Sequence, residues 1–202
     1  MSSALLAIVC IVSGYLIGTI PTGLILGRLA GINLRQTGSG NIGATNVLRT
    51  LGVIPAIIVV LADPLKAALI TLVPAWLGLS PWVIAATALA VVLGNTFNVF
   101  LGFTGGKGVA TSIGAFLAVD PLLAVLAIII GVYVIVLSRM VSLGALTGMF
   151  SAPVLIIASG NRTTSTIILI GLIVALVTIK HHENITRLWA GVERRISRDK
   201  QP

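Results

Sequence analysis

Three segments combine glycine with polar and basic residues inside an otherwise apolar chain, and they are where chemistry could occur. The first is residues 37–49, TGSGNIGATNVLR. Its glycines let the backbone approach a ligand closely, and the N–H groups of such a loop entering a helix form a site for an anion. Close helix packing or a turn would also explain the glycines, but neither requires serine, two asparagines and an arginine beside them. The expected substrate-binding residues of this loop are Gly38, Gly40, Asn41, Asn46 and Arg49, with Ser39 as a catalytic candidate.

The second segment is residues 102–112, GFTGGKGVATS. It has the composition of a phosphate loop but not the spacing GxxxxGK[ST]. No strand precedes it and no acidic partner for Mg²⁺ is evident, so a nucleotide P-loop is rejected. Backbone N–H groups and the Lys107 ammonium could still meet a phosphate at a helix N-terminus, although Lys107 could instead serve membrane topology alone. The expected phosphate-binding residues here are Gly105, Gly106, Lys107, Gly108 and Thr111.

The third segment is residues 180–193, KHHENITRLWAGVE. On a helix its apolar residues form a stripe, which is typical of an amphipathic helix at the membrane interface. That interpretation accounts for His182 and for the arginine pair 194–195. His181 and Asn184 fit it less well, because they are polar groups at positions i and i+3 at the exit of an apolar run. We therefore expect His181 and Asn184 to be catalytic residues.

At these residues the chain resembles the bacterial acyl phosphate:glycerol-3-phosphate acyltransferase family (PlsY), integral membrane enzymes of phospholipid synthesis. The resemblance covers nearly the whole chain, and the three motifs occur in the family's order and spacing. It is carried by residues 38–46 with Arg49, 100–103, 105–111, His181, Asn184, Ile185, Arg187, Leu188, Gly191 and Glu193, and by Asp63, Leu65 and Lys66.

The second motif departs from the family's usual pattern. Gly94 is followed by Asn95 where a histidine is usual, Asn98 stands where proline is common, and Thr104 replaces a residue that is often basic. We therefore give Asn95 no catalytic role. Either a histidine is not required at this position, or Asn95 replaces it as a hydrogen-bonding group.

The resemblance implies transfer of a fatty acyl group from acyl phosphate to the sn-1 hydroxyl of glycerol 3-phosphate. Such a mixed anhydride has a good leaving group, so the enzyme needs mainly positioning and charge stabilisation. No Ser-His-Asp arrangement can be identified from the spacing, and no acyl-enzyme is expected. The hydroxyl proton could go to His181 or to a phosphate oxygen of a substrate, with Ser39, His181 and Asn184 orienting the glycerol phosphate.

No cofactor and no metal are expected, because the five acidic residues are scattered and the single cysteine, Cys10, lies in an apolar run. The expected partners are acyl phosphate, glycerol 3-phosphate, membrane lipids and the enzyme that makes acyl phosphate, with no nucleic acid. The expected location is the bacterial inner membrane, with the active site facing the cytoplasm.

The elements that position these motifs follow from composition. Of the 202 residues, 57% are hydrophobic and only 9% are charged, so the chain cannot cover a water-soluble surface. It is expected to be one all-α membrane domain, residues 1–202, of about seven transmembrane helices, some short or broken, ending in a basic tail at 180–202. The apolar runs are 4–27, 53–79, 82–103, 108–119, 122–137, 141–159 and 164–179.

Two of these runs are unusual. The fourth has about 12 residues, or about 18 Å of helix, which is short for a hydrocarbon core of about 30 Å. The second contains Asp63, Pro64 and Lys66 and could break into two shorter helices. Charges at that depth are expensive unless they pair with one another or face a cavity.

The basic residues predict an orientation, since cytoplasmic loops carry the excess of Lys and Arg. An outside N-terminus and a cytoplasmic C-terminus leave only Arg162 outside, and they place all three motifs at one face. The resemblance implies the same seven-span topology. A small transporter of a phosphorylated solute is the alternative, but its path would have few ionisable residues beyond Asp63 and Lys66. A CDP-alcohol phosphotransferase would need an acidic metal cluster that the chain lacks.

Overall fold

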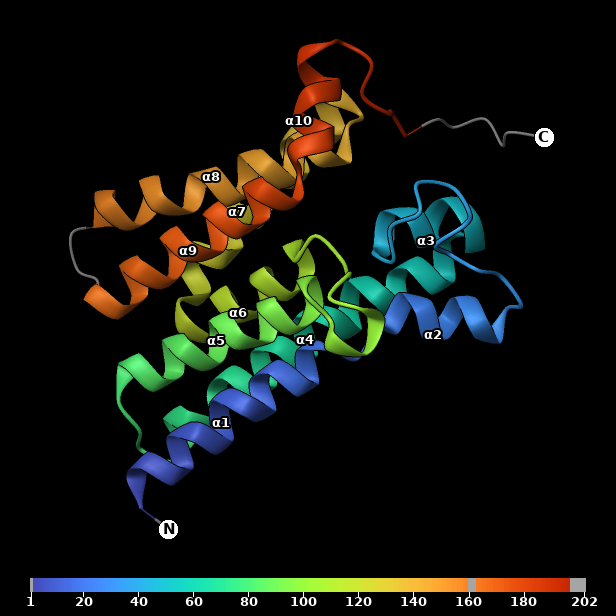
Figure 1. The fold of residues 1–202 in the computed structure, drawn as a ribbon. Helices are drawn as coiled ribbons and strands as arrows, with labels where there is room; N and C mark the ends of the chain where they lie inside the picture. The colour runs from blue at the N-terminus through green and yellow to red at the C-terminus, as the bar shows by residue number, and fades with distance from the viewer. Residues whose placement is uncertain (1, 160–162, 197–202) are drawn as a thin grey trace. The chain divides into compact units, whose positions relative to one another are not determined.

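The computed structural model describes residues 2–159 and 163–196, and these residues form helices and no strands. The chain divides into two compact units, residues 1–119 and 120–202. The helices of the first unit are α1 (Ser3–Gly18), α2 (Thr22–Leu29), α3 (Ala44–Leu51), α4 (Val53–Trp76), α5 (Pro81–Thr96), the 3₁₀ turn η1 (Val99–Leu101) and α6 (Val109–Val119). Those of the second unit are α7 (Pro121–Ser138), α8 (Val141–Ser159), α9 (Thr164–Lys180) and α10 (His182–Trp189) (Figure 1).

Every predicted apolar run is largely helical, which confirms an all-α membrane protein. The run 4–27 is divided between α1 and α2, and the run 82–103 continues beyond α5 into η1 and a loop. Apolar runs become helices in lipid because the backbone must satisfy its own hydrogen bonds there. Within the described ranges, five helical segments are long and apolar enough to cross a membrane, or six if α9 and α10 are one span bent by 64°. The 11-residue α6 is shorter, as its run predicted. The count of seven spans, the orientation and the single domain stay predictions, and Arg162 lies outside the described residues.

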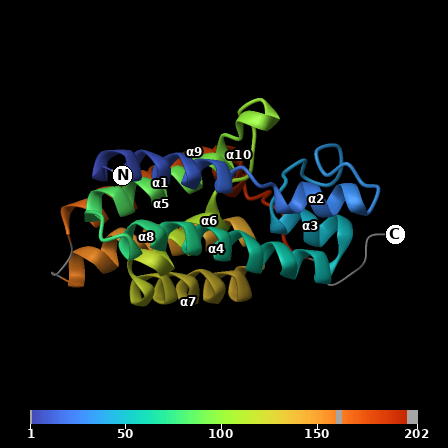
Figure 2. The ribbon, with the colours of Figure 1, turned by 90° about the horizontal axis from the view of Figure 1, so that it is seen from below.

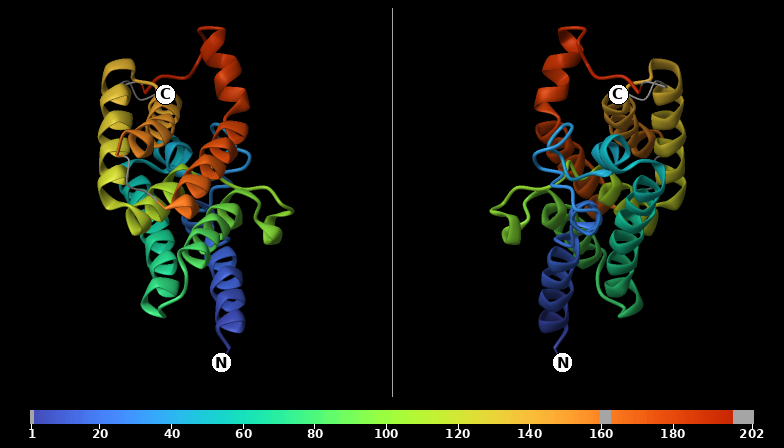
Figure 3. Two further views of the ribbon diagram at one scale, coloured as in Figure 1. Left: turned by 90° about the vertical axis from the view of Figure 1, so that its left-hand side faces the viewer. Right: turned by 90° about the vertical axis from the view of Figure 1, so that its right-hand side faces the viewer.

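In the first unit α1 packs along α5 through small residues (Figure 3). A Cβ added to Gly18 would collide with the carbonyl oxygen of Val91, and one added to Gly94 would collide with that of Tyr15. The Tyr15 hydroxyl also donates to the carbonyl of Phe97 at 2.7 Å. Small residues allow helix backbones to approach in a membrane, where the hydrophobic effect does not drive helices together.

Helix α4 holds the remaining elements of this unit, since α1, α2, α3, α5 and α6 all pack against it. It is one continuous helix with Pro64 inside, so the expectation that this run might break in two is wrong. The charges within it pair, as expected: Lys66 Nζ lies 2.8 Å from Asp63 Oδ1. Lys66 also donates to the Ile20 carbonyl at 2.6 Å, and Thr22 donates to Asp63 at 2.7 Å. The pair therefore anchors the break between α1 and α2 to the middle of α4.

In the second unit α7 and α8 pack side by side, and α9 packs on α8. Gly131 of α7 faces Gly144 and Gly148 of α8 at close approach. Helix α7 begins where the Asp120 carboxylate accepts the N–H of Leu123 at 3.0 Å, with Pro121 directly after it. Helix α10 then turns away from α9 and begins the predicted basic tail, of which residues 197–202 are outside the described part.

Candidate active site

The first glycine loop is fixed by a small hydrophobic core of its own. Leu34 and Ile42, at either side of the loop, are buried with Leu24 of α2, Val47 of α3 and Val59 of α4. Figure 2 shows α2 and α3 beside the N-terminal part of α4, which is where this core lies. The loop is thus packed against three helices. Such packing can fix the loop backbone in one conformation.

Asn46 shapes this loop from below. Its side chain is only 1% exposed. Its Oδ1 accepts the N–H of Ser39 at 2.8 Å, while its Nδ2 donates to the carbonyls of Leu34 and Thr37, each at 3.1 Å. Gly38 has φ +64°, and a Cβ there would collide with Asn46 Oδ1. The sequence predicted that Asn46 binds substrate. In the structure the hydrogen bonds of its side chain fix the conformation of the loop backbone.

The groups left on the surface of the loop are those able to meet a substrate. Ser39, Gly40 and Arg49 are exposed, and Arg49 lies on α3, one turn after Asn46. Asn41 is half-buried, and its side-chain oxygen accepts the N–H of Gly43 at 2.8 Å. This segment therefore exposes a hydroxyl and a guanidinium, whereas the N–H groups of Ser39, Gly40 and Gly43 donate within the loop, to Asn46, Thr37 and Asn41.

The second glycine loop is built against the end of α5. The N–H of Gly106 donates to the carbonyl of Asn95 at 2.9 Å, and a Cβ on Gly105 would collide with the same carbonyl. Gly108 and Thr111 open α6, where the buried Thr111 hydroxyl donates to the Gly108 carbonyl at 3.0 Å. Lys107, directly before Gly108, is half-buried. The glycines are needed because the loop backbone lies directly on α5.

Among the departures from the family pattern, the side chain of Asn98 has a structural role. Asn95 supports the double glycine only through its backbone carbonyl, which a histidine would also supply. Asn98 is buried, donates to the Thr19 carbonyl at the end of α1 at 2.6 Å, and accepts the N–H of Phe100 at 3.0 Å. The segment from α5 to the second loop, visible as a loop in Figure 3, is therefore tied to α1 by an amide that a proline lacks.

Arg35, which we did not select from the sequence, joins the two glycine loops. Its guanidinium donates to Thr104 Oγ1 at 2.7 Å and to the Leu101 carbonyl at 3.4 Å. A cavity of about 240 Å³ lies between the loops, lined by Arg35, Gly40, Ile42, Thr104 and Gly105. The first unit therefore brings its two predicted motifs to one place. No spacing signal marked Arg35, because its partner is distant in sequence.

The third motif lies in the second unit, at the junction of α9 and α10. His181 is 3% exposed, and its Nδ1 lies 2.8 Å from the Val177 carbonyl oxygen. A carbonyl can only accept, so Nδ1 carries the proton in this contact and Nε2 carries the lone pair of the neutral ring. In this tautomer Nε2, rather than Nδ1, is the ring nitrogen that would accept a proton. His182 is exposed, with its Nδ1 3.0 Å from the Ile179 carbonyl, so it lies apart from His181 as predicted.

Glu193 collects the polar groups of this motif. One carboxylate oxygen accepts from Asn184 at 2.7 Å and from Ser142 at 2.8 Å, and the other accepts from Arg187 Nε at 2.8 Å. Burial acts to raise the pKa of Glu193, but these hydrogen bonds and the charge of Arg187 outweigh it and hold the pKa below its usual value. Asn184 is buried and held in place by this contact.

Glu193 and Ser142 were not selected as site residues, yet one signal was available. Gly191 has φ +71°, and the N–H of Val192 bonds back to the Arg187 carbonyl at 2.9 Å, which ends α10 and reverses the chain. A glycine after an amphipathic helix predicts such a reversal and would have returned Glu193 toward Asn184. Ser142 has no comparable signal.

These three polar sites can be compared with known proteins. The sequence pattern of the family described as "Glycerol-3-phosphate acyltransferase" matches residues 8–191. The chain belongs to this family. Its activity is accordingly the transfer of an acyl group to glycerol 3-phosphate, and phospholipid synthesis follows from that activity. The alternative of a solute transporter is set aside.

Individual glycerol-3-phosphate acyltransferases agree with this assignment. The chain is 47% identical to an enzyme of Thermus thermophilus, with 90% of this chain and 91% of the relative covered. It is 46% identical to the Geobacter sulfurreducens enzyme, with 90% and 93% covered. Crystal structures of PlsY (YgiH), an integral membrane glycerol 3-phosphate acyltransferase, are also similar. The glycerol 3-phosphate form has 37% identity, TM-score 0.90 and coverage of 95% and 96%. The lysophosphatidic acid form has 36% identity and TM-score 0.88, and 95% of each chain is covered.

Proposed function

We propose that this acyltransferase takes its acyl group from acyl phosphate and places it on the sn-1 hydroxyl of glycerol 3-phosphate, giving lysophosphatidate and phosphate. The observation that carries the proposal is the cavity between the two glycine loops, which is lined by Arg35 and by Gly40 and Gly105 of the loops. Both substrates are phosphate esters or anhydrides, and both need cationic and N–H donors. Asp63 is the single acidic residue of residues 1–119, and it is paired with Lys66, so no other acidic side chain of the first unit opposes a phosphate at these loops.

In the proposed reaction the glycerol hydroxyl oxygen attacks the acyl carbonyl carbon, and the bond from that carbon to the phosphate oxygen breaks. Phosphate leaves with the electron pair, where Lys107, Arg49 and the loop N–H groups stabilise its charge. The hydroxyl proton passes to a base. The tautomer of His181 supports its Nε2 as that base, and a substrate phosphate oxygen is the other acceptor.

Ser39, His181 and Asn184 are proposed to orient the glycerol phosphate together. Ser39 offers its exposed hydroxyl from the first unit, and Asn184 is fixed by Glu193 in the second. We also propose the inner membrane as the location and the cytoplasmic face as the side of the site. The basic residues support this, since the positive-inside rule puts Arg35, Arg49 and Lys107 on that side.

The test is phosphate release by the purified protein in detergent, given palmitoyl phosphate with and without glycerol 3-phosphate, and palmitoyl-CoA as a second donor. We expect release that depends on glycerol 3-phosphate and formation of an equal amount of lysophosphatidate. Turnover with palmitoyl-CoA should be negligible, because the sequence contains no recognisable nucleotide-binding motif for the CoA part of this donor. Comparable turnover with palmitoyl-CoA would contradict the proposed donor.

A further inference from the structure

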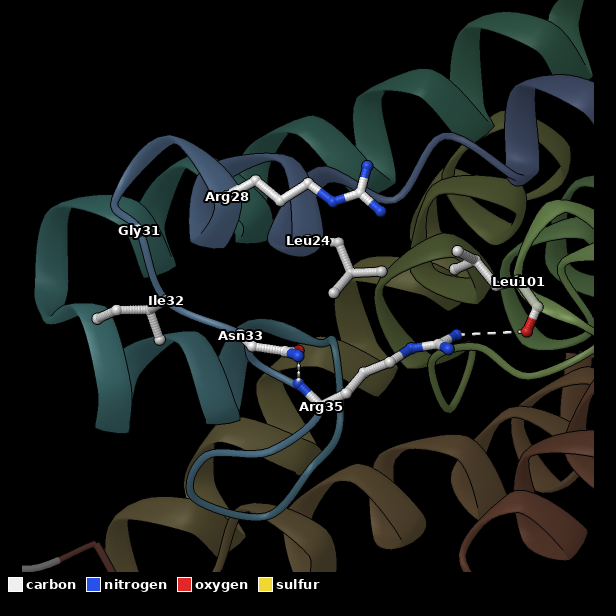
Figure 4. Close-up of a pocket in the computed structure, with 7 residues that line it drawn as sticks. All are labelled: Leu24, Arg28, Gly31, Ile32, Asn33, Arg35 and Leu101. Atoms are coloured by element: carbon white, nitrogen blue, oxygen red, sulfur yellow. Dashed lines mark hydrogen bonds between the residues drawn. The ribbon is translucent and has the colours of Figure 1, made fainter.

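The first unit has a second cavity, besides the one between the glycine loops, whose lining residues could bind an anion. It has a volume of about 420 Å³ and lies between α2, the start of the first loop and η1. Two arginines line it: Arg28 comes from the last turn of α2, and Arg35 from the loop. Figure 4 shows both side chains extending in the same direction along the cavity, with Leu24 between them.

The charge of this cavity is unbalanced. The guanidinium of Arg28 has no hydrogen-bond or ion-pair partner within residues 2–159 and 163–196. Arg35 uses a single terminal nitrogen on Leu101 and Thr104, which leaves donors of its guanidinium directed elsewhere. Asp63, the sole acid of residues 1–119, is bound to Lys66 and Thr22. Two guanidinium groups at one cavity without a carboxylate favour an anion with several acceptor oxygens.

The cavity has apolar as well as polar walls, which favours an amphiphilic anion. Leu24, Ile32 and Leu101 line it together with Asn33 and the two arginines. Two large apolar side chains next in sequence to lining residues are exposed: Leu29, after Arg28, at 80%, and Phe100, before Leu101, at 72%. A small hydrophilic ion would satisfy the arginines and leave these side chains without a partner. An amphiphile with a phosphate group would satisfy both.

We propose that this cavity binds the phosphodiester head group of an anionic membrane phospholipid. Arg28 and Arg35 bind its phosphate oxygens, Asn33 meets the polar part of the head group, and Leu29 and Phe100 contact the acyl chains. Because Arg35 also holds Thr104, next to Gly105, a bound lipid fixes the residue that joins the two glycine loops. The lipid is then a structural ligand of the active-site region. This consequence rests on the proposed function, but the binding of the lipid does not depend on that function.

Lipid retention measured by native mass spectrometry tests the binding. Four proteins are compared: the unmodified chain, Arg28→Gln, Arg28→Lys and the control Arg195→Gln. Each is placed in nanodiscs of phosphatidylcholine containing phosphatidylglycerol and is released from them in the mass spectrometer. Arg195 is also exposed but lies in the second unit. We expect the unmodified chain and the control to retain phosphatidylglycerol selectively, and Arg28→Gln to bind it at least about 10-fold more weakly. Arg28→Lys keeps the charge and should retain part of the preference.

Three results would overturn the proposal. The first is equal retention by Arg28→Gln and the control, and the second is equal retention of phosphatidylcholine and phosphatidylglycerol. The third is displacement by inorganic phosphate as effective as displacement by excess phosphatidylglycerol, which would assign the cavity to free phosphate. Acyl transfer is measured on the same samples in phosphatidylcholine alone, where Arg28→Gln should match the unmodified chain. An inactive unmodified chain that still retains the lipid would refute the proposed function but not the site.

Discussion

Single side chains of the first glycine loop divide into exposed ones, which we propose meet a substrate, and buried ones, which hold the loop in place. Ser39 and Arg49 are exposed, whereas Asn46 is buried and its side-chain amide is hydrogen-bonded to the loop backbone. Both kinds looked alike in the sequence, because a glycine-rich motif marks a loop without saying which polar residues point outward. Burial separates them. Substitution of Asn46 should act through loop shape, and substitution of Ser39 or Arg49 through direct loss of contacts.

Replacing Ser39, His181 or Asn184 by alanine should each lower turnover about 10²- to 10⁴-fold, the range for losing a positioned acid–base or oxyanion group. Pairs of substitutions should fall far short of additivity, because residues acting as one unit fail together. Steady-state phosphate release on protein confirmed to be folded in detergent measures the effect. His182→Ala is the matched control and should keep most activity, since that ring is exposed and bonds elsewhere. An essential His182 beside a dispensable His181 would refute the assignment.

Arg49→Lys should lower kcat/KM about 10-fold or more, a loss of about 1.4 kcal/mol in transition-state stabilisation. Lysine keeps the charge but not the two-pronged hydrogen bonding of a guanidinium to phosphate. Kinetics with glycerol 3-phosphate and acyl phosphate varied in turn would show which substrate Arg49 binds. If Arg49→Ala were folded and fully active, the residue would serve topology only.

At the scale of elements, hydrophobicity predicted the helices well and tertiary contacts poorly. Each apolar run became a helix because lipid leaves the backbone no other partner. The contact of Arg35 with Thr104 and that of Glu193 with Ser142 join residues far apart in sequence. Such contacts depend on how helices pack, and no local pattern records them. In helix α4 the local pattern was misleading. Pro64 suggested a break, yet the helix is continuous and packs on five neighbouring elements.

The α10 segment should be sensitive to acid through Glu193. Its pKa is lowered in the folded protein, so the carboxylate contributes stability at pH values above its unfolded pKa of about 4.5. That contribution is lost as the pH falls below about 4.5 and through the lowered folded pKa. Thermal unfolding in detergent between about pH 6 and pH 3 should therefore show a falling Tm.

Glu193→Gln should cost about 1–3 kcal/mol of stability at neutral pH, because Arg187 loses its charged acceptor. The Tm of this variant should change less with acid than that of the unmodified chain, since the titrating group is gone. Tm curves that run parallel for the two proteins would show that another group controls the acid response.

At the scale of the molecule, charge is distributed in accordance with a phosphate-handling enzyme. The chain carries 13 basic and five acidic residues, and the first unit, with both glycine loops, contains Asp63 as its only acid. Catalysis of phosphate departure can therefore depend on fixed cations and N–H groups throughout the site. We therefore expect that no exchangeable ion is required to neutralise the leaving group.

Activity should be unchanged by EDTA. Three of the five acids lie at 183–199 and the other two lie apart in sequence, so no carboxylate cluster is available to hold Mg²⁺ beside a phosphate. Phosphate release measured before and after chelation, and after adding Mg²⁺ or Mn²⁺, checks this. Loss of turnover on chelation and its recovery with either ion would remove Lys107 and Arg49 from the role of leaving-group stabilisers.

The tight contact of Gly18 with Val91 also sets an order of events during biosynthesis. Helix α1 leaves the ribosome about seventy residues before its partner on α5, which at about 5–20 residues per second is a delay on the order of several seconds. Throughout that interval the small-residue face of α1 meets lipid, because the backbone it fits does not yet exist. The nascent chain must therefore insert α1 as an independent span first and dock it later. Until α5 arrives, α1 has its own hydrophobicity and its contacts with α4, which is synthesised before α5, to hold it in the bilayer.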